Sequence, residues 1–151
     1  MVIEVDQSGK LEKTSIPTVI AFSNGVSKSA IISSTEKQKL ENHFRLLGKR
    51  RVYVYQSFAT ILFLLLKDEK KVEEVVIDTE YPGQAPLIKN ILLNLAEKKL
   101  RIDKRDNTFK QIGKKSNAHN TAYLAYKSGS ATITLTAIDI IKHLPQTKKS
   151  G

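Results

Sequence analysis

The fold is decided by a stretch near the middle of the chain, Val72-Glu73-Glu74-Val75-Val76-Ile77-Asp78-Thr79-Glu80-Tyr81. Its apolar run, residues 75–77, is typical of a strand that is buried on both faces of a sheet. Asp78 and Glu80 follow at the carboxyl end of that strand, where open α/β sheets hold their ligands. We therefore predict that Asp78 belongs to an acidic, metal-holding site. The alternative is that its carboxylate only caps the next helix.

Outward from this stretch, the chain alternates between strand and helix patterns. The predicted elements are, in order, a strand at 2–6, hairpin strands at 18–22 and 28–33, helices at 35–47 and 58–67, the strand at 75–77, a helix at 86–99, a strand or hairpin at 100–111, and helices at 118–127 and 134–144. Asn24-Gly25 supplies the tight hairpin turn, and Thr35 to Gln38 resemble a capping box. Residues 52–55 have the composition of a strand, or else begin the helix that follows.

Composition limits the class of protein. The chain has 151 residues, of which 40% are hydrophobic, so one α/β domain over residues 1–145 can bury a core, and residues 146–151 are expected to form a disordered tail. There is no cysteine, which excludes disulfides and thiolate metal sites and agrees with a cytoplasmic protein. The longest apolar stretch, residues 61–66, is too short to span a bilayer, and no export signal is found. We therefore expect no membrane association.

Positive charge is in excess, because 25 Lys and Arg oppose 15 Asp and Glu, giving a net charge of +10. This excess favours a polyanionic partner, and nucleic acid is the commonest one. The alternatives are a generic basic surface and the lysine enrichment of thermophiles. The residues that we expect to contact phosphates are Lys49, Arg50, Arg51, Lys114, Lys115 and Asn117.

At three places the chain resembles the ribonuclease H-like superfamily, which includes ribonuclease H, Holliday-junction resolvases, transposases and the slicer domain of Argonaute proteins. Residues 2–9, Val-Ile-Glu-Val-Asp-Gln-Ser-Gly, look like the first strand, whose aspartate is the anchor ligand. Residues 76–81 look like the fourth strand, which ends in a second carboxylate. Residues 112–125 look like the last loop and helix, in which resolvases carry an acid or histidine and then a second acid three residues later. The resemblance implies a mixed five-stranded sheet flanked by helices.

The resemblance also implies a metal site built from Asp6, Asp78 and His119. The chain departs from the family pattern at Ala122, where many members carry an aspartate, and at Gln56, near the place of the helix glutamate. The acids that remain as substitutes are Glu36, Glu41 and Glu80, with Asp139 as a further candidate. Asp6 has the alternative role of a turn residue, and His119 that of a helix cap or surface residue.

Two carboxylates at the ends of neighbouring strands can hold hard cations such as Mg²⁺ or Mn²⁺. We therefore predict a metal-dependent endonuclease that acts on structured nucleic acid, either an RNA–DNA hybrid or branched DNA. Its predicted catalytic residues are Asp6, Asp78, His119 and Glu80. The alternatives are a non-catalytic nucleic-acid-binding module with a degenerate site, and a small assembly protein with an acidic partner. Whether the protein forms a homodimer is left open.

Overall fold

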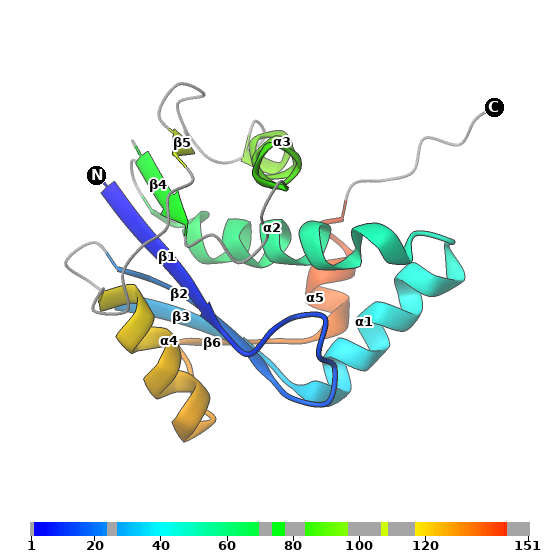
Figure 1. Ribbon diagram of the computed structural model, residues 1–151, viewed down its shortest axis with the longest axis horizontal. Helices are drawn as coiled ribbons and strands as arrows, with labels where there is room; N and C mark the ends of the chain where they lie inside the picture. The colour runs from blue at the N-terminus through cyan, green and yellow to red at the C-terminus, as the bar shows by residue number, and fades with distance from the viewer. Residues whose placement is uncertain are drawn as a thin grey trace.

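The computed structural model describes residues 2–23, 27–69, 74–77, 84–96, 107–108 and 117–144 (Figure 1). Its strands are β1 (Val2–Ser8), β2 (Thr18–Ser23), β3 (Ser27–Ile32), β4 (Glu74–Ile77), β5 (Asn107–Thr108) and β6 (Ile133–Leu135). Its helices are α1 (Ser34–Leu46), the 3-10 helix η1 (Arg50–Val52), α2 (Tyr53–Leu66), α3 (Ala85–Ala96), α4 (Asn117–Ser128) and α5 (Ala137–Ile141). The predicted α/β class, a mixed sheet flanked by helices, is confirmed.

The strands of the described part form one sheet in the order β5-β4-β1-β2-β3-β6. β2 runs antiparallel to its neighbours β1 and β3, whereas the pairs β1–β4, β4–β5 and β3–β6 are parallel. Every strand except β2 therefore points in one direction, so the carboxyl ends of these strands meet at the same edge of the sheet. β1 lies between β2 and β4, in the interior of the sheet, and it carries Asp6 toward that edge.

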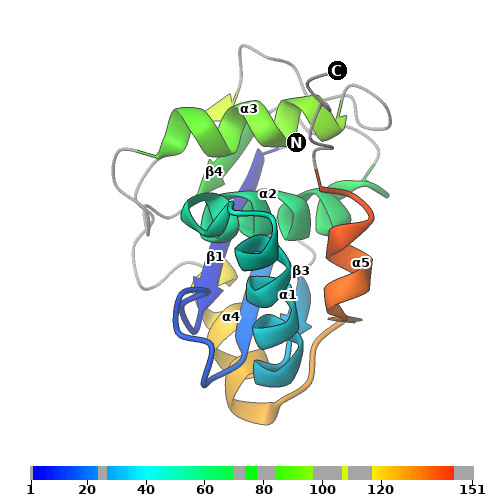
Figure 2. The ribbon, with the colours of Figure 1, turned by 90° about the vertical axis from the view of Figure 1, so that its right-hand side faces the viewer.

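The two faces of the sheet are covered differently (Figure 1). One face, with Val5 and Phe22, packs against α1, α2, α3 and α5 in the main core. Helix α2 supplies much of that core, since residues 57–66 are all buried. The opposite face carries Val19, Ala21 and Ile31, and α4 covers it. Figure 2 shows α1 and α5 side by side, with α3 lying over α2.

Lys37 of α1 holds the loop between β1 and β2 from inside the molecule. Its side chain is 0% exposed, and its Nζ donates to the backbone carbonyls of Lys10, Lys13 and Ile16 at 2.9, 2.7 and 2.7 Å. Burial lowers the pKa of Lys37 to about 8, while the carboxylate of Glu12 acts in the opposite direction. The three carbonyls use all the N–H donors of an ammonium group, so this lysine fixes the loop that follows the Asp6 strand.

The same loop is tied down at both of its ends. Gly9 has a φ of 80°, and a Cβ at this position would overlap the carbonyl oxygen of Pro17, so the turn after β1 requires glycine. The hydroxyl of Thr18 donates to the carbonyl of Gly9 at 2.9 Å. The hydroxyl of Tyr53, at the start of α2, donates to the carbonyl of Leu11 at 2.9 Å.

Two predicted helix starts are wrong by a few residues. The cap of α1 is Ser33, whose hydroxyl accepts the N–H of Glu36 at 3.2 Å, instead of the predicted box at 35–38. Helix α2 begins at Tyr53 instead of the predicted residue 58. Of the two alternatives for residues 52–55, the start of a helix is therefore confirmed, with Val52 as the last residue of η1.

The predicted helix over residues 134–144 is also wrong, because the segment divides into β6 and α5. The β-branched residues Ile133 and Thr134 pair with β3. Thr136 then starts α5 with a capping box, in which its hydroxyl and the Asp139 carboxylate each accept the other residue's backbone N–H. The Asn24-Gly25 turn, most of the 100–111 segment and the 146–151 tail lie outside the described residues.

Candidate functional site

Asp6 is the member of the predicted acid pair that the structure describes. It is 2% exposed, and its Oδ1 accepts the backbone N–H of Gln7 at 2.8 Å. Asp6 lies opposite Ala21 of β2 in the register, so both side chains share the face that α4 covers. A carboxylate buried to this degree has to be matched by polar groups or by a cation, because an uncompensated buried charge is strongly unfavourable.

Asp78 and Glu80 lie outside the described residues. The parallel register of β1 and β4 runs from Val2 with Glu74 to Val5 with Ile77. In this last pair, Val5 comes directly before Asp6, and Ile77 comes directly before position 78. The strand that contains Asp6 and the strand that precedes position 78 in the sequence are therefore neighbours in register.

Helix α4 carries Asn117 and His119 in its first turn. The helix packs across β1, β2 and β3, on the face of the sheet that holds Asp6. Ala122, three residues after His119, is 0% exposed and belongs to the apolar cluster with Ala21. The position that resembles the family's second acid is thus an apolar contact between helix and sheet.

The carboxylates of α1 have other partners. Glu36 Oε1 accepts the N–H of Ala137 at 2.9 Å and thereby joins α1 to α5, and its Oε2 pairs with Lys39 at 3.0 Å. The hydrogen bond from Ala137, followed by that from Lys39, lowers the pKa of Glu36. Glu41 pairs with Arg45 at 2.9 Å. Both acids thus stabilise helices that pack on the main-core face of the sheet, opposite α4.

Within the part of the chain that the structure describes, no group of three or more His, Asp or Glu side chains is arranged to hold a metal ion. Gln56 lies in the first turn of α2, whose buried side packs on the main-core face, and Asp139 caps α5. A complete metal site at Asp6 therefore requires ligands from segments beyond the described ones, to which Asp78 and Glu80 belong.

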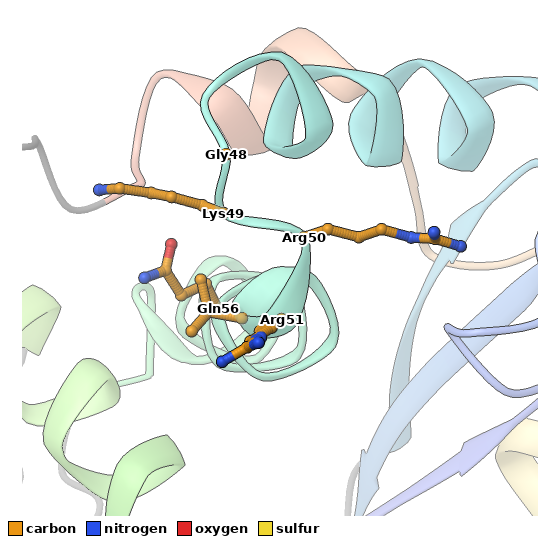
Figure 3. Close-up of a pocket in the computed structure, with 6 residues that line it drawn as sticks. Gly48, Lys49, Arg50, Arg51 and Gln56 are labelled. Atoms are coloured by element: carbon orange, nitrogen blue, oxygen red, sulfur yellow. The ribbon is translucent and has the colours of Figure 1, made fainter.

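A basic turn joins α1 to α2 and borders a hollow of about 630 Å³. The residues that line the hollow are Gly48, Lys49, Arg50, Arg51, Val52 and Gln56. The side chains of Lys49, Arg51 and Gln56 lie on one side of the turn, whereas that of Arg50 extends in the opposite direction (Figure 3). The three adjacent cations of the sequence therefore do not form one cluster. Lys114 and Lys115, the other predicted phosphate contacts, lie outside the described residues.

Two features of these sites were not predicted from the sequence. Lys37 stands three residues before Leu40 and seven before Phe44, on the buried stripe of α1, so helical periodicity was the signal that could have indicated its burial. Gln56 was considered only as a replacement for a metal-binding glutamate. Its position four residues after Val52 in a helical segment was the signal that could have grouped it with the basic turn.

No protein family model, curated protein or solved structure matches the chain. None of the helices in the described ranges is long and apolar enough to cross a membrane. The nucleic-acid partner, the Mg²⁺ or Mn²⁺ cofactor, the homodimer and the cytoplasmic location stay predictions. Function therefore has to be inferred from the geometry around Asp6 and around the basic turn.

Proposed function

We propose that the protein is a divalent-metal-dependent endonuclease of ribonuclease H-like type that cleaves an RNA–DNA hybrid or branched DNA. The observation that carries this proposal is the buried carboxylate of Asp6 on the interior strand of the sheet. Beside it, the register of β4 leads directly to position 78. We take this pairing to continue by one residue beyond Ile77, so that the carboxylates of Asp6 and Asp78 meet at the edge where the parallel strands end.

The donor chemistry fits a hard cation, because carboxylate oxygens are the ligands that Mg²⁺ and Mn²⁺ prefer. When bound, such ions would supply an activated water and would stabilise the leaving oxygen of a phosphodiester. In this proposal Asp6 and Asp78 hold the metal, with Glu80 as an additional acid. His119 lies in the first turn of the helix that crosses the same face and serves as the third ligand.

The arrangement of elements gives further support. The described part contains a strand, an antiparallel hairpin and then parallel strands beside β1, as the resemblance implies. It differs from the implied five-stranded sheet in having β6, which pairs in parallel with β3 at the other edge. The net charge of +10 suits a polyanionic substrate.

One observation favours the second candidate, a nucleic-acid-binding module without catalysis. Ala122 replaces an acid of the family pattern and is fully buried among apolar side chains, so the position offers no ligand. A site that lacks this acid would hold a second ion weakly, because fewer carboxylates offset its charge. The fold and the basic surface would then be retained for binding alone.

Cleavage assays with Mg²⁺ or Mn²⁺ test the first candidate on hybrid, branched and single-stranded substrates. Asp6→Asn and Asp78→Asn should each reduce the cleavage rate by more than the ~10–100-fold typical of outer-shell partners of a metal. Asp68→Asn removes an exposed acid near the end of α2 and should leave the rate unchanged. Circular dichroism must show that the variants are folded.

Activity that survives Asp78→Asn would exclude the assigned metal site. A folded wild-type protein that binds these substrates without cleaving them in either metal would support the non-catalytic module instead.

A further inference from the structure

The basic turn is held rigidly by its own backbone. Gly48 has a φ of 68°, which ends α1. The N–H of Lys49 donates to the carbonyl of Phe44 at 2.8 Å, and the N–H of Val52 donates to the carbonyl of Lys49 at 3.1 Å. Below the turn, the rings of Phe44 and Tyr53 meet edge to face at 5.7 Å in the main core. The starting points of the side chains on this turn are therefore fixed, which lowers the entropic cost of binding a ligand.

The side of the turn that faces the hollow carries two cations. Lys49 and Arg51 extend to this side together with the amide of Gln56, while Arg50 points the other way (Figure 3). Neither Lys49 nor Arg51 forms an ion pair with a carboxylate of the described residues. A guanidinium can hold a phosphate through two parallel hydrogen bonds, and an ammonium adds a point charge.

The size and the remaining lining of the hollow indicate what accompanies the phosphate. A volume of about 630 Å³ falls within the ~300–1,000 Å³ range of small-ligand sites. Val52 is half-buried and offers an apolar wall, and the Gln56 amide can both donate and accept hydrogen bonds at the edge of a base or sugar. Two cations together with an apolar wall and an amide suit the two parts of a nucleotide, its phosphate and its sugar with the base.

We propose that this hollow binds one nucleotide of a nucleic-acid strand. Lys49 and Arg51 hold its phosphate, and Val52 and Gln56 contact its sugar and base. This inference rests on the proposed function only in taking nucleic acid as the partner. The hollow lies on the helical side of the molecule that covers the main core, so it is a binding subsite separate from the face that carries Asp6.

Charge reversals at two adjacent arginines provide a matched test. Arg50 also borders the hollow, but its side chain extends away from those of Lys49, Arg51 and Gln56 (Figure 3). Arg51→Glu and Arg50→Glu therefore change the net charge equally, while only the first places a carboxylate on the side of the turn that carries Lys49 and Gln56. Binding of a fluorescent single-stranded oligonucleotide is measured by anisotropy in EDTA over a series of salt concentrations. We expect Arg51→Glu to weaken binding about tenfold or more and to flatten the salt dependence, and Arg50→Glu to weaken it less than about threefold.

Lys49→Ala should also weaken binding, as Arg51→Glu does. Equal losses for the two reversals would show that only net charge matters and would overturn the proposal, as would no loss for either.

A competition experiment distinguishes a nucleotide from free phosphate as the ligand of the hollow. Adenosine monophosphate should displace the oligonucleotide at concentrations at which inorganic phosphate does not, and equal competition would contradict contacts to sugar and base.

The chelator keeps this test independent of catalysis. If cleavage proves insensitive to Asp6→Asn and Asp78→Asn while the two arginine reversals differ as expected, the nuclease proposal fails and the subsite stands. If cleavage depends on both acids while the two reversals have the same effect on binding, only the subsite proposal fails.

Discussion

Single buried polar groups differ in whether they have a partner. Two hydroxyls of α2 show the contrast. The hydroxyl of Tyr53 donates to the carbonyl of Leu11, and burial raises the pKa of this phenol, so the hydroxyl keeps its proton and acts as a donor. The hydroxyl of Ser57 is fully buried and has no hydrogen-bond partner among the described residues. The two groups should therefore respond oppositely to removal.

We expect Tyr53→Phe to lower the free energy of unfolding by ~1–3 kcal/mol, because the Leu11 carbonyl loses its donor inside the protein. Ser57→Ala should leave stability unchanged or raise it by up to ~1 kcal/mol, since an unpaired hydroxyl is replaced by a methyl group with higher helix propensity. Urea unfolding of the three proteins measures both effects. Equal destabilisation by the two substitutions would show that the Tyr53 hydrogen bond contributes nothing specific.

Prediction from sequence at this scale depends on whether a residue behaves as its type usually does. Asp6 was predicted at a strand end because residues 2–6 alternate apolar and polar, and the structure places it within β1. Lys37 was not predicted to be buried, because lysine is almost always exposed. Its spacing from Leu40 and Phe44 is consistent with burial, but the three carbonyls that accept its hydrogen bonds belong to a loop more than twenty residues earlier, and the local pattern gives no sign of them.

At the scale of elements, the attachment of α5 to α1 depends on ionised acids. The N–H of Ala137 lowers the pKa of Glu36 most strongly, and the backbone N–H of Thr136 does the same for Asp139. A carboxyl whose pKa is lowered by folding stabilises the fold above its ordinary value, which is 4.5 for Glu36, and loses this effect as pH falls through the folded value. The contact between α1 and α5 should therefore weaken only in acid.

A pH titration followed by NMR tests whether the contact between α1 and α5 depends on the ionised carboxylate of Glu36. The amide proton of Ala137 should shift with a midpoint below 4.5, since it reports the ionisation of Glu36. In Glu36→Gln the shift should disappear, while the Thr136 amide still reports Asp139. A midpoint at or above 4.5 in the wild type would contradict the hydrogen bond from Ala137.

Elements defined by local pattern were predicted well. The apolar run at 58–66 and the two hairpin strands form as expected, because composition and turn residues specify them within a short window. The 134–144 segment failed because β6 exists through pairing with β3, about one hundred residues earlier. The local pattern of this segment fits a helix, but pairing with the edge of the sheet at β3 outweighs it.

At the scale of the whole molecule, Lys37 makes global stability depend on pH in the alkaline range. Its folded pKa of about 8 lies below the ordinary 10.5, so between these values the unfolded chain binds the additional proton. Stability from this group is therefore greatest above about 10.5 and falls as pH drops toward 8.

We expect the free energy of unfolding of the wild type to rise between pH 8 and 10 relative to that of Lys37→Met, which has no proton to lose. Urea unfolding at several pH values measures the difference. Lys39→Met, which changes an exposed lysine of the same helix, should keep the wild-type slope. Parallel pH profiles for the wild type and Lys37→Met would show that burial does not shift this lysine.

The candidate site is a property of the whole chain and could be predicted only in part. The sequence indicated that the strands preceding Asp6 and Asp78 belong to one sheet, and the parallel pairing of β1 with β4 agrees. The division of the basic turn into two directions was not predictable, because it follows from how Gly48 and η1 turn the backbone between two packed helices.

The ammonium enclosed by three loop carbonyls occupies the place that a potassium or sodium ion takes in many oxygen-lined cages. Here the positive charge is covalently tethered to α1, so neither dilution nor a chelator can remove it. The shape of the segment that leaves β1 is consequently independent of the ionic composition of the solvent.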